Sequence, residues 1–365
     1  MTRKSIFLCL FALVLAACTA RGPLLNVPPD APSSDSVDIF VATNRTEFLS
    51  KTELGRSTTT RHFRYELRVP TDHVAGTLSL PGRRADPDRH FLTQSAVEYP
   101  SQDAFSRQIR AELAQRPTNE QTIFVYIHGF NNSFAEGIVR HAQLDHDLDS
   151  PGVSVHFSWP SAASPLGYAH DRDSVLYSRD ALESLLRGLP SARGKIVLVA
   201  HSMGSQLAME TLRQVEIASP GWGKRNLGAV ILFSPDIDID LFRQQAARIG
   251  PLPQPFLVFA SKRDHILNLS ATLTGEENRL GSVADAQELA DLEITLMNVS
   301  DFSRGVGHFN VGDSADLISI LRRMARMEGA FGEGQGRTDF VPGTILTVRN
   351  VTEIILSPLS ALDGR

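Results

Sequence analysis

The chain contains the stretch Lys195-Ile-Val-Leu-Val-Ala-His-Ser-Met-Gly204, in which an apolar run leads directly into a serine between small residues. The run predicts a buried strand over 195–200, and the pattern that follows predicts a helix over 203–217. A serine at such a turn, with small residues two positions before and after it, is typical of a nucleophile elbow, where strand and helix approach closely. The alternative is that Ser202 is a loop serine that only caps the helix.

Strands and helices alternate on both sides of this turn. Further strands are predicted over 122–127, 153–158, 229–233, 256–260 and 293–299, and further helices over 133–148, 172–188, 239–248, 283–291 and 313–327. Several of the strands are almost continuously apolar, which is expected when helices cover both faces of a sheet. The alternation therefore predicts an α/β domain over 36–327 with a mainly parallel central sheet.

Shorter strand patterns lie at the two ends of this domain. Apolar runs at 37–42, 63–69 and 77–80, separated by turn-rich stretches, predict an antiparallel lead-in to the sheet. Residues 328–365 are predicted to form a Gly-rich linker and a short C-terminal extension. Within that extension, 344–355 has the pattern of two short strands, whose place in the fold does not follow from the sequence.

The N-terminus is predicted to be a targeting signal. Residues 1–17 form a secretory signal pattern, because two cationic residues precede an apolar run that is too short to span a bilayer. The run ends in Leu-Ala-Ala-Cys18, which resembles the lipobox of bacterial lipoproteins, so we expect Cys18 to carry acyl chains such as palmitate. Thr19 favours the outer membrane, and 18–35 is expected to be a flexible tether. An ordinary signal with an incidental cysteine is the alternative.

Composition excludes several other classes of protein. The 365 residues include 36 Lys and Arg against 41 Asp and Glu, spread along the chain, so a dedicated nucleic-acid binder is not expected. Both cysteines, Cys9 and Cys18, lie at the N-terminus, so the folded domain contains no disulfide. The sequence has no His-Glu-x-x-His motif and no phosphate-binding Gly-rich loop, and helix capping explains the Asp-rich stretch 236–240. No metal and no cofactor is therefore expected.

Partners for Ser202 occur further along the chain. Asp264 follows the predicted strand 256–260, and His308 lies in the loop before the last predicted helix. Each is placed just beyond the carboxyl end of a strand, where ligands bind in open parallel sheets. A serine needs a base to take its proton, and the base needs a carboxylate to orient it. The sequence therefore predicts a triad of Ser202, His308 and Asp264.

A second aspartate could also be the acid of this triad. Asp236 follows the preceding strand and is the alternative carboxylate, although Asp236 or Asp240 would also serve as a helix cap. His201 and His265 are poorly placed as bases, because one lies inside the elbow and the other is next to Asp264. His308 is therefore preferred as the base.

An oxyanion hole is predicted beside the serine. The strand ending at residue 127 is followed by a His-Gly turn whose backbone can present N–H groups to a developing negative charge. We assign these donors to Phe130 and to Met203, the residue after the serine. His128 is predicted to be structural, because it lies just before the turn.

These residues together resemble the alpha/beta-hydrolase superfamily over residues 37–327. Segments 40–45 (Phe-Val-Ala-Thr-Asn-Arg), 128–131 (His-Gly-Phe-Asn), 157–161 (Phe-Ser-Trp-Pro-Ser) and 279–281 (Arg-Leu-Gly) resemble a bacterial subgroup that is largely without assigned substrates. The resemblance implies serine-hydrolase chemistry and says little about substrate. No catalytic role for 40–45 or 157–161 follows from the sequence, and Trp159 either lines the pocket or packs under the loop.

The function expected from the sequence is a membrane-anchored serine hydrolase that cleaves carboxylic esters of a small molecule or lipid. Esters are preferred to amides and thioesters by analogy with the fold. Segment 267–283 is either a cover over the site or an ordinary connection. A non-enzymatic envelope lipoprotein that uses the scaffold to bind a partner is the alternative from another class.

Overall fold

The structure is a computed structural model that describes most of the predicted domain. The described residues are 22–46, 54–82, 84–190, 196–275, 279–283, 286–303, 307–308, 310–326, 344–348 and 350–356. The predicted signal 1–17, the predicted lipid site Cys18 and the Gly-rich stretch 328–339 lie outside them. No helix within the described ranges is both long and apolar enough to cross a bilayer.

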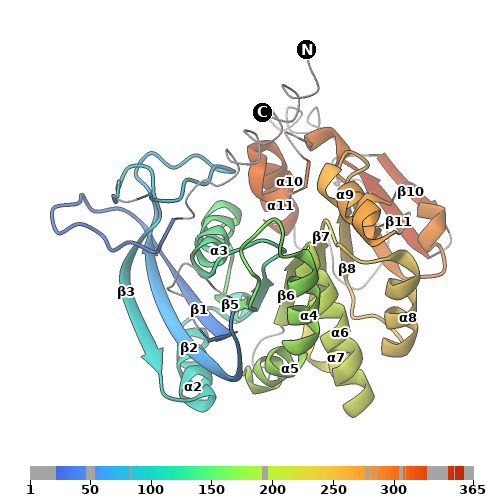
Figure 1. Ribbon diagram of the computed structural model, residues 1–365, viewed down its shortest axis with the longest axis horizontal. Coiled ribbons are helices and arrows are strands. Elements are labelled where there is room, and N and C mark those ends of the chain that lie inside the picture. The colour runs from blue at the N-terminus through green and yellow to red at the C-terminus, as the bar shows by residue number, and fades with distance from the viewer. Residues whose placement is uncertain are drawn as a thin grey trace, which may run out of the picture.

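The described strands form one sheet with the order β10-β11-β9-β8-β7-β6-β4-β5-β1-β2-β3 (Figure 1). Its centre consists of the predicted parallel strands: β4 (Ile123–Ile127), β5 (Val153–Ser158), β6 (Ile196–His201), β7 (Leu227–Phe233), β8 (Phe256–Ala260) and β9 (Ile294–Asn298). Their side chains are largely buried on both faces, as the continuous apolar runs predict. All of their carboxyl ends lie at one edge of the sheet, where the candidate site is found.

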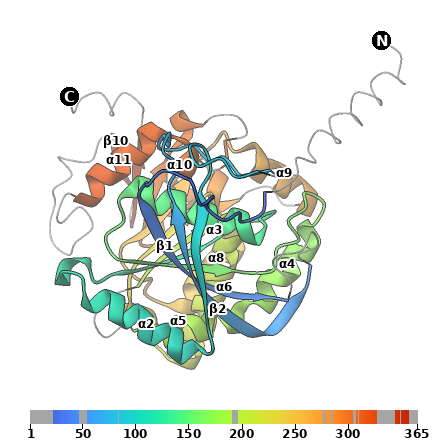
Figure 2. The same cartoon turned by 90° about the vertical axis from the view of Figure 1, so that its left-hand side faces the viewer.

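The antiparallel lead-in is confirmed, with one strand misplaced. Strand β1 (Ser36–Arg45) is parallel to β5 and antiparallel to β2 (Arg56–Arg68), which pairs with β3 (Leu92–Tyr99) (Figure 2). The strand predicted over 77–80 is wrong, because this segment forms no strand and β3 takes its place in the sheet. Most side chains of β3 are exposed, and its buried and exposed residues do not alternate, so this edge strand has no apolar alternation that would reveal it.

The C-terminal strands belong to the same sheet. Strand β11 (Val351–Ile355) is parallel to β9, and β10 (Thr344–Val348) is antiparallel to β11. Val351 is fully buried in the main core. The predicted extension therefore completes the sheet of the domain, and the domain does not end at residue 327.

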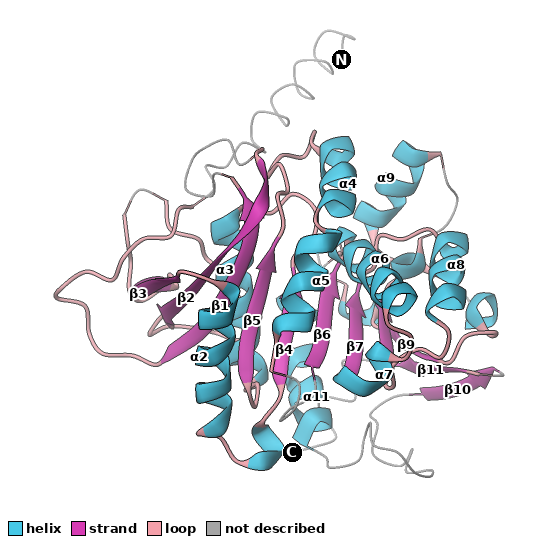
Figure 3. Ribbon diagram, turned by 90° about the horizontal axis from the view of Figure 1, so that it is seen from below, coloured by secondary structure: helices cyan, strands magenta, loops and turns pink. Residues whose placement is uncertain are grey.

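Helices cover both faces of the sheet (Figure 3). On one face are α2 (Gln102–Ala114), α4 (Tyr168–Tyr177), α5 (Arg179–Gly188), α6 (Met203–Ala218), α7 (Trp222–Asn226) and α8 (Ile239–Ile249). On the other are α3 (Phe134–Leu148), α10 (Asn310–Asp313) and α11 (Ala315–Arg326), while α9 (His265–Thr274) follows β8. The fold is thus the predicted mainly parallel sheet between helical layers.

Two of the predicted helices differ from the structure. The helix predicted over 172–188 is two helices, α4 and α5, which meet at the buried Ser178, whose hydroxyl accepts a hydrogen bond from Asn44 Nδ2 at 3.0 Å. The helix predicted over 283–291 is only a short 3-10 turn at Ala286–Leu289. Helices α2, α7, α9 and the short α10 were not predicted.

The segment predicted as a tether lies partly on the sheet. Backbone hydrogen bonds join Leu25 O to Thr93 N at 2.8 Å and Val27 N to Thr93 O at 3.0 Å. The Ser34 hydroxyl donates to Val69 O at 2.8 Å. Proline-rich chain is extended, so its remaining N–H and C=O groups can pair with an exposed strand. Residues 25–34 are therefore attached to β3 and to Val69, just after β2.

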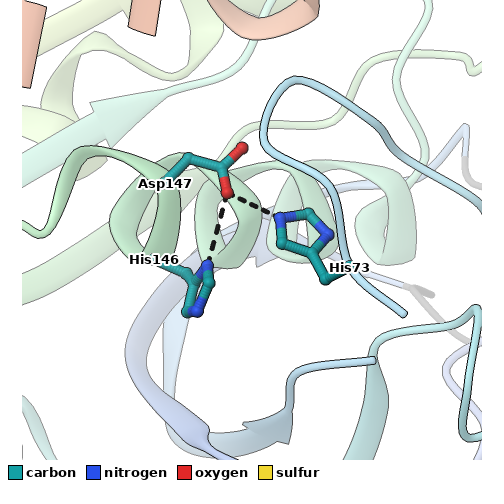
Figure 4. A group of neighbouring side chains, drawn as sticks. All are labelled: His73, His146 and Asp147. Atoms are coloured by element: carbon teal, nitrogen blue, oxygen red, sulfur yellow. Dashed lines mark hydrogen bonds and ion pairs between the residues drawn. The ribbon is translucent and has the colours of Figure 1, made fainter. Parts of the chain in front are cut away.

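A buried carboxylate fixes the loop that follows β2 (Figure 4). Asp147 on α3 bonds to His73 Nε2 at 2.6 Å and to His146 Nδ1 at 3.3 Å, and it accepts the Gly76 N–H at 2.8 Å. Burial opposes ionisation of Asp147, but hydrogen bonds from His146 and His73 outweigh it and hold its pKa well below the usual range. The ionised carboxylate thus ties the loop to α3.

Candidate active site

Ser202 stands at a strained turn between β6 and α6. Its φ of 53° and ψ of −124° are rare for a residue with a side chain, and such strain is characteristic of functional turns. Surrounding bonds hold the turn, since Ser202 N donates to Phe233 O at 2.9 Å and Ser202 O accepts from Asp236 N at 3.2 Å. A Cβ on Gly204 would lie 2.3 Å from His128 O, so only glycine allows this close approach. The elbow geometry predicted for this stretch is present.

His308 and Asp264 meet Ser202 at the carboxyl edge of the sheet. His308 Nε2 lies 2.9 Å from Ser202 Oγ, and His308 Nδ1 lies 2.8 Å from Asp264 Oδ2. The Asp264 side chain is fully buried, and its other oxygen accepts the Leu267 N–H at 2.9 Å, which caps α9. The three side chains predicted from the sequence are therefore in one hydrogen-bonded row.

A glycine brings the histidine loop to the acid. Gly307 has a φ of 68°, and a Cβ there would lie 2.4 Å from Arg263 O. The left-handed conformation and the close contact both require glycine, and both place His308 beside Asp264.

The loop after β4 passes directly against the serine. A Cβ on Gly129 would lie 2.9 Å from the Cβ of Ser202 and 2.7 Å from His201 Nδ1. Among the described residues, neither the Phe130 N–H nor the Met203 N–H donates to an acceptor. Two unpaired amide donors on the two turns that meet at a serine are what an oxyanion hole requires.

Residues 101–324 match the family described as "Alpha/beta hydrolase of unknown function (DUF900)". The chain belongs to this alpha/beta-hydrolase family. No curated protein matches the sequence of this hydrolase.

The hydrolase is also similar to solved structures of esterases at low identity. An esterase from the fungus Rhizomucor miehei is 11% identical over 73% of this chain and 75% of that one, with a TM-score of 0.33. A hyperthermophilic esterase from the archaeon Pyrobaculum calidifontis is 13% identical over 80% and 87%, with a TM-score of 0.33. An arylesterase is 11% identical over 88% and 91%, with a TM-score of 0.35.

In this hydrolase the alternative acid, Asp236, has other partners. Its carboxylate lies 3.3 Å from Arg279 Nε, and accepts hydrogen bonds from Tyr168 Oη at 3.0 Å and Ser270 Oγ at 2.7 Å. None of these carboxylate contacts is with Ser202 or His308. The helix near 239 is capped by neither Asp236 nor Asp240, as Asp238 Oδ1 accepts the Leu241 N–H at 2.9 Å.

The other histidines are not placed as bases. The His201 ring packs 4.9 Å from the His308 ring, and burial together with the nearby charge of His308 holds its pKa well below the usual range. Burial and the neighbouring Arg45 lower the pKa of His128 to about 3. His265 is exposed at the start of α9. His128 is thus a neutral, structural side chain, as predicted.

Sequence reasoning missed several polar residues around the site. Tyr168 and Ser270 hold Asp236, and Asp171 on α4 binds the loop after β4 through Asn131 N at 3.3 Å. Nothing in the local sequence pattern marks these positions, since their partners come from distant segments. Trp159 is fully buried under His128, so it packs beneath the loop and does not line a pocket.

One group of metal-ligand side chains occurs in the described part of the chain, formed by His73, His146 and Asp147. The 2.6 Å separation of His73 Nε2 and Asp147 Oδ1 is that of a direct hydrogen bond. Two ligands of a tetrahedral zinc would lie about 3.3 Å apart, given bond lengths of about 2.0 Å. The group is therefore interpreted as a hydrogen-bonded cluster.

Proposed function

We propose that this hydrolase cleaves carboxylic esters through an acyl-enzyme formed on Ser202. The observation that carries the proposal is the continuous hydrogen-bonded row from Asp264 through His308 to Ser202 Oγ. Each member is held by its own structure: an elbow, a glycine-containing loop and a helix cap. Such preorganisation is what distinguishes a nucleophilic site from a chance cluster of polar groups.

In the proposed reaction, His308 Nε2 takes the Ser202 proton as Oγ attacks the ester carbonyl. The N–H groups of Phe130 and Met203 stabilise the negative oxygen of the tetrahedral intermediate. His308 then gives the proton to the departing alcohol, which leaves an acyl group on Ser202. Asp264 accepts the Nδ1–H bond throughout, which fixes the tautomer and stabilises the imidazolium.

Water completes the cycle. His308 removes a proton from a water molecule, which attacks the acyl carbon, and the acid product leaves as Ser202 regains its proton. An alcohol is a better leaving group than an amine, which favours ester over amide substrates. The same machinery would accept a thioester, so the ester preference is the part of the proposal that a substrate panel decides.

Labelling with a fluorophosphonate probe tests the nucleophile. The wild type should be labelled, and Ser202→Ala should not, while both keep the same circular dichroism spectrum. A folded wild type that resists labelling would contradict the proposal. Hydrolysis rates for matched short-chain oxyesters, thioesters and anilides then rank the substrates, and a faster anilide would replace esterase by amidase.

We further propose that the enzyme is anchored through lipidated Cys18 in the outer membrane, facing the periplasm. The Leu-Ala-Ala-Cys18 pattern after a short apolar run supports this location. Globomycin, which blocks lipoprotein signal cleavage, should cause the precursor to accumulate, and Cys18→Ser should abolish labelling by an alkyne palmitate analogue. Normal processing under globomycin would argue against the anchor.

A further inference from the structure

A buried arginine touches the loop that carries the proposed oxyanion donor Phe130. Arg45 at the end of β1 is 1% exposed. Its guanidinium group donates to Asn132 O at 3.0 Å, to Ser161 O at 2.9 Å and, through Nε, to Ser158 Oγ at 3.1 Å. It also lies 3.4 Å from His128 Nε2. One rigid side chain thus joins both ends of the 128–132 loop to the segment after β5.

A buried aspartate completes the attachment from the other side. Asp171 on α4 is fully buried and accepts bonds from Ser161 Oγ at 2.6 Å, Ala162 N at 2.6 Å and Asn131 N at 3.3 Å. Ser161 Oγ in turn accepts the Asn132 N–H at 3.2 Å. The backbone N–H groups of Asn131 and Asn132 are therefore bonded to Asp171 and Ser161 of this scaffold.

An aromatic pair supports the start of the same loop. Trp159 and His128 stack with ring centroids 4.9 Å apart and an interplanar angle of 10°. Trp159 Nε1 also donates to His128 O at 2.8 Å. The loop is thereby held at residue 128 and again at 131–132, and the amide of Phe130 lies between these two fixed points.

We propose that Arg45 and Asp171 are positioning residues that aim the Phe130 N–H at the oxyanion. This inference rests on the proposed function, and it supplies a role for the 40–45 and 157–161 segments. Oxyanion donors must lie about 2.7–3.1 Å from the developing charge, so a loop that drifts by one ångström loses most of their effect. The described contacts of Arg45 and Asp171 include neither Ser202 nor His308, and we infer that the two residues act through the loop.

The first test compares Asp171→Asn with a matched variant, Asp147→Asn. Both aspartates are buried, and both accept a backbone N–H from a loop, but Asp147 holds the 73–76 loop on α3 (Figure 4). Asp171→Asn should lower kcat about 10- to 100-fold, less than the full loss of one donor, with KM changed about twofold or less. Asp147→Asn should lower stability and leave kcat unchanged. Equal kcat values in the two variants would overturn the proposal.

Inhibitor binding separates positioning from general damage. A boronic acid that forms a tetrahedral adduct with Ser202 uses the oxyanion donors, whereas an unreactive ether analogue of the ester does not. Asp171→Asn should weaken the binding of the boronic acid by the same factor by which it lowers kcat/KM, and it should leave the binding of the ether analogue unchanged. Arg45→Lys should behave likewise, because an ammonium group cannot make the several contacts of the guanidinium. Equal weakening of both inhibitors would contradict the assignment.

A third measurement is independent of turnover. Amide hydrogen exchange over 129–132 should become faster in Asp171→Asn and stay unchanged in Asp147→Asn. If the wild type is neither labelled nor active, the proposed function fails, while faster exchange in Asp171→Asn still shows that this residue fixes the loop. Unchanged exchange in an active enzyme would overturn the positioning role alone.

Discussion

Asp236 and Asp264 follow the neighbouring strands β7 and β8, and both are buried carboxylates at the same edge of the sheet. Their partners differ, because Asp264 faces the imidazole of His308 whereas Asp236 faces the guanidinium of Arg279. A histidine can gain and lose a proton near neutral pH, but an arginine stays charged. Position at a strand end is therefore not enough to make a carboxylate the acid of a triad, and its partner decides the role.

The largest expected effect is on kcat, which should distinguish Asp264 from Asp236. Asp264→Asn should lower kcat for a chromogenic ester about 10⁴-fold, because the amide favours the wrong imidazole tautomer. The fold should survive, since asparagine is as good a helix cap as aspartate. Steady-state kinetics of Asp264→Asn and Asp236→Asn decide the point, and a greater loss in the second variant would reverse our assignment.

The next largest effect is on the stability of the fold, to which Asp236 should contribute through Arg279. Asp236→Asn removes the buried carboxylate charge that faces Arg279 at 3.3 Å and should lower the free energy of unfolding by about 3–5 kcal/mol. Its kcat should fall far less than that of Asp264→Asn. Urea denaturation followed by circular dichroism measures the change, and an unaltered midpoint would show that the ion pair does not stabilise the fold.

A double substitution tests whether Asp236 and Arg279 stabilise the fold as a pair. Arg279→Met in the Asp236→Asn background replaces the buried guanidinium with an apolar side chain, so the double variant should regain about 1–3 kcal/mol of stability relative to Asp236→Asn. The same denaturation experiment yields the coupling energy between the two positions. Additive losses would mean that Asp236 and Arg279 act independently.

The smallest effect concerns a third aspartate of this edge, Asp238. Its carboxylate caps α8 through the Leu241 N–H and contacts neither His308 nor Arg279 in the described structure. Asp238→Ala should lower stability by about 1 kcal/mol and leave kcat unchanged. Thermal unfolding and the ester assay together check this, and a clear kcat loss would assign Asp238 a role that its contacts do not indicate.

The parts predicted well from sequence depend on local pattern. The parallel strands are apolar runs, and the helix predicted over 133–148 is α3, which begins with a capping box of Ser133 and Glu136. Ser202, Asp264 and His308 were predictable because parallel strands bring their carboxyl ends to one edge. The parts not predicted depend on long-range contacts. Asp171 reaches the loop after β4 across 40 residues, and β3 is an exposed edge strand without alternation.

The outermost strands of the sheet affect how the protein could associate with itself. Each side of the sheet ends in an antiparallel pair, β2 with β3 and β10 with β11, whereas the strands from β1 to β11 are parallel. The outermost strand β3 carries exposed polar side chains, including Glu98 paired with Arg61 at 2.8 Å. Unprotected sheet edges invite aggregation, and charged edge strands discourage it. A protein truncated after Arg326 would keep Ser202, Asp264 and His308, yet it would bare the backbone of β9 and gain a new surface for self-association.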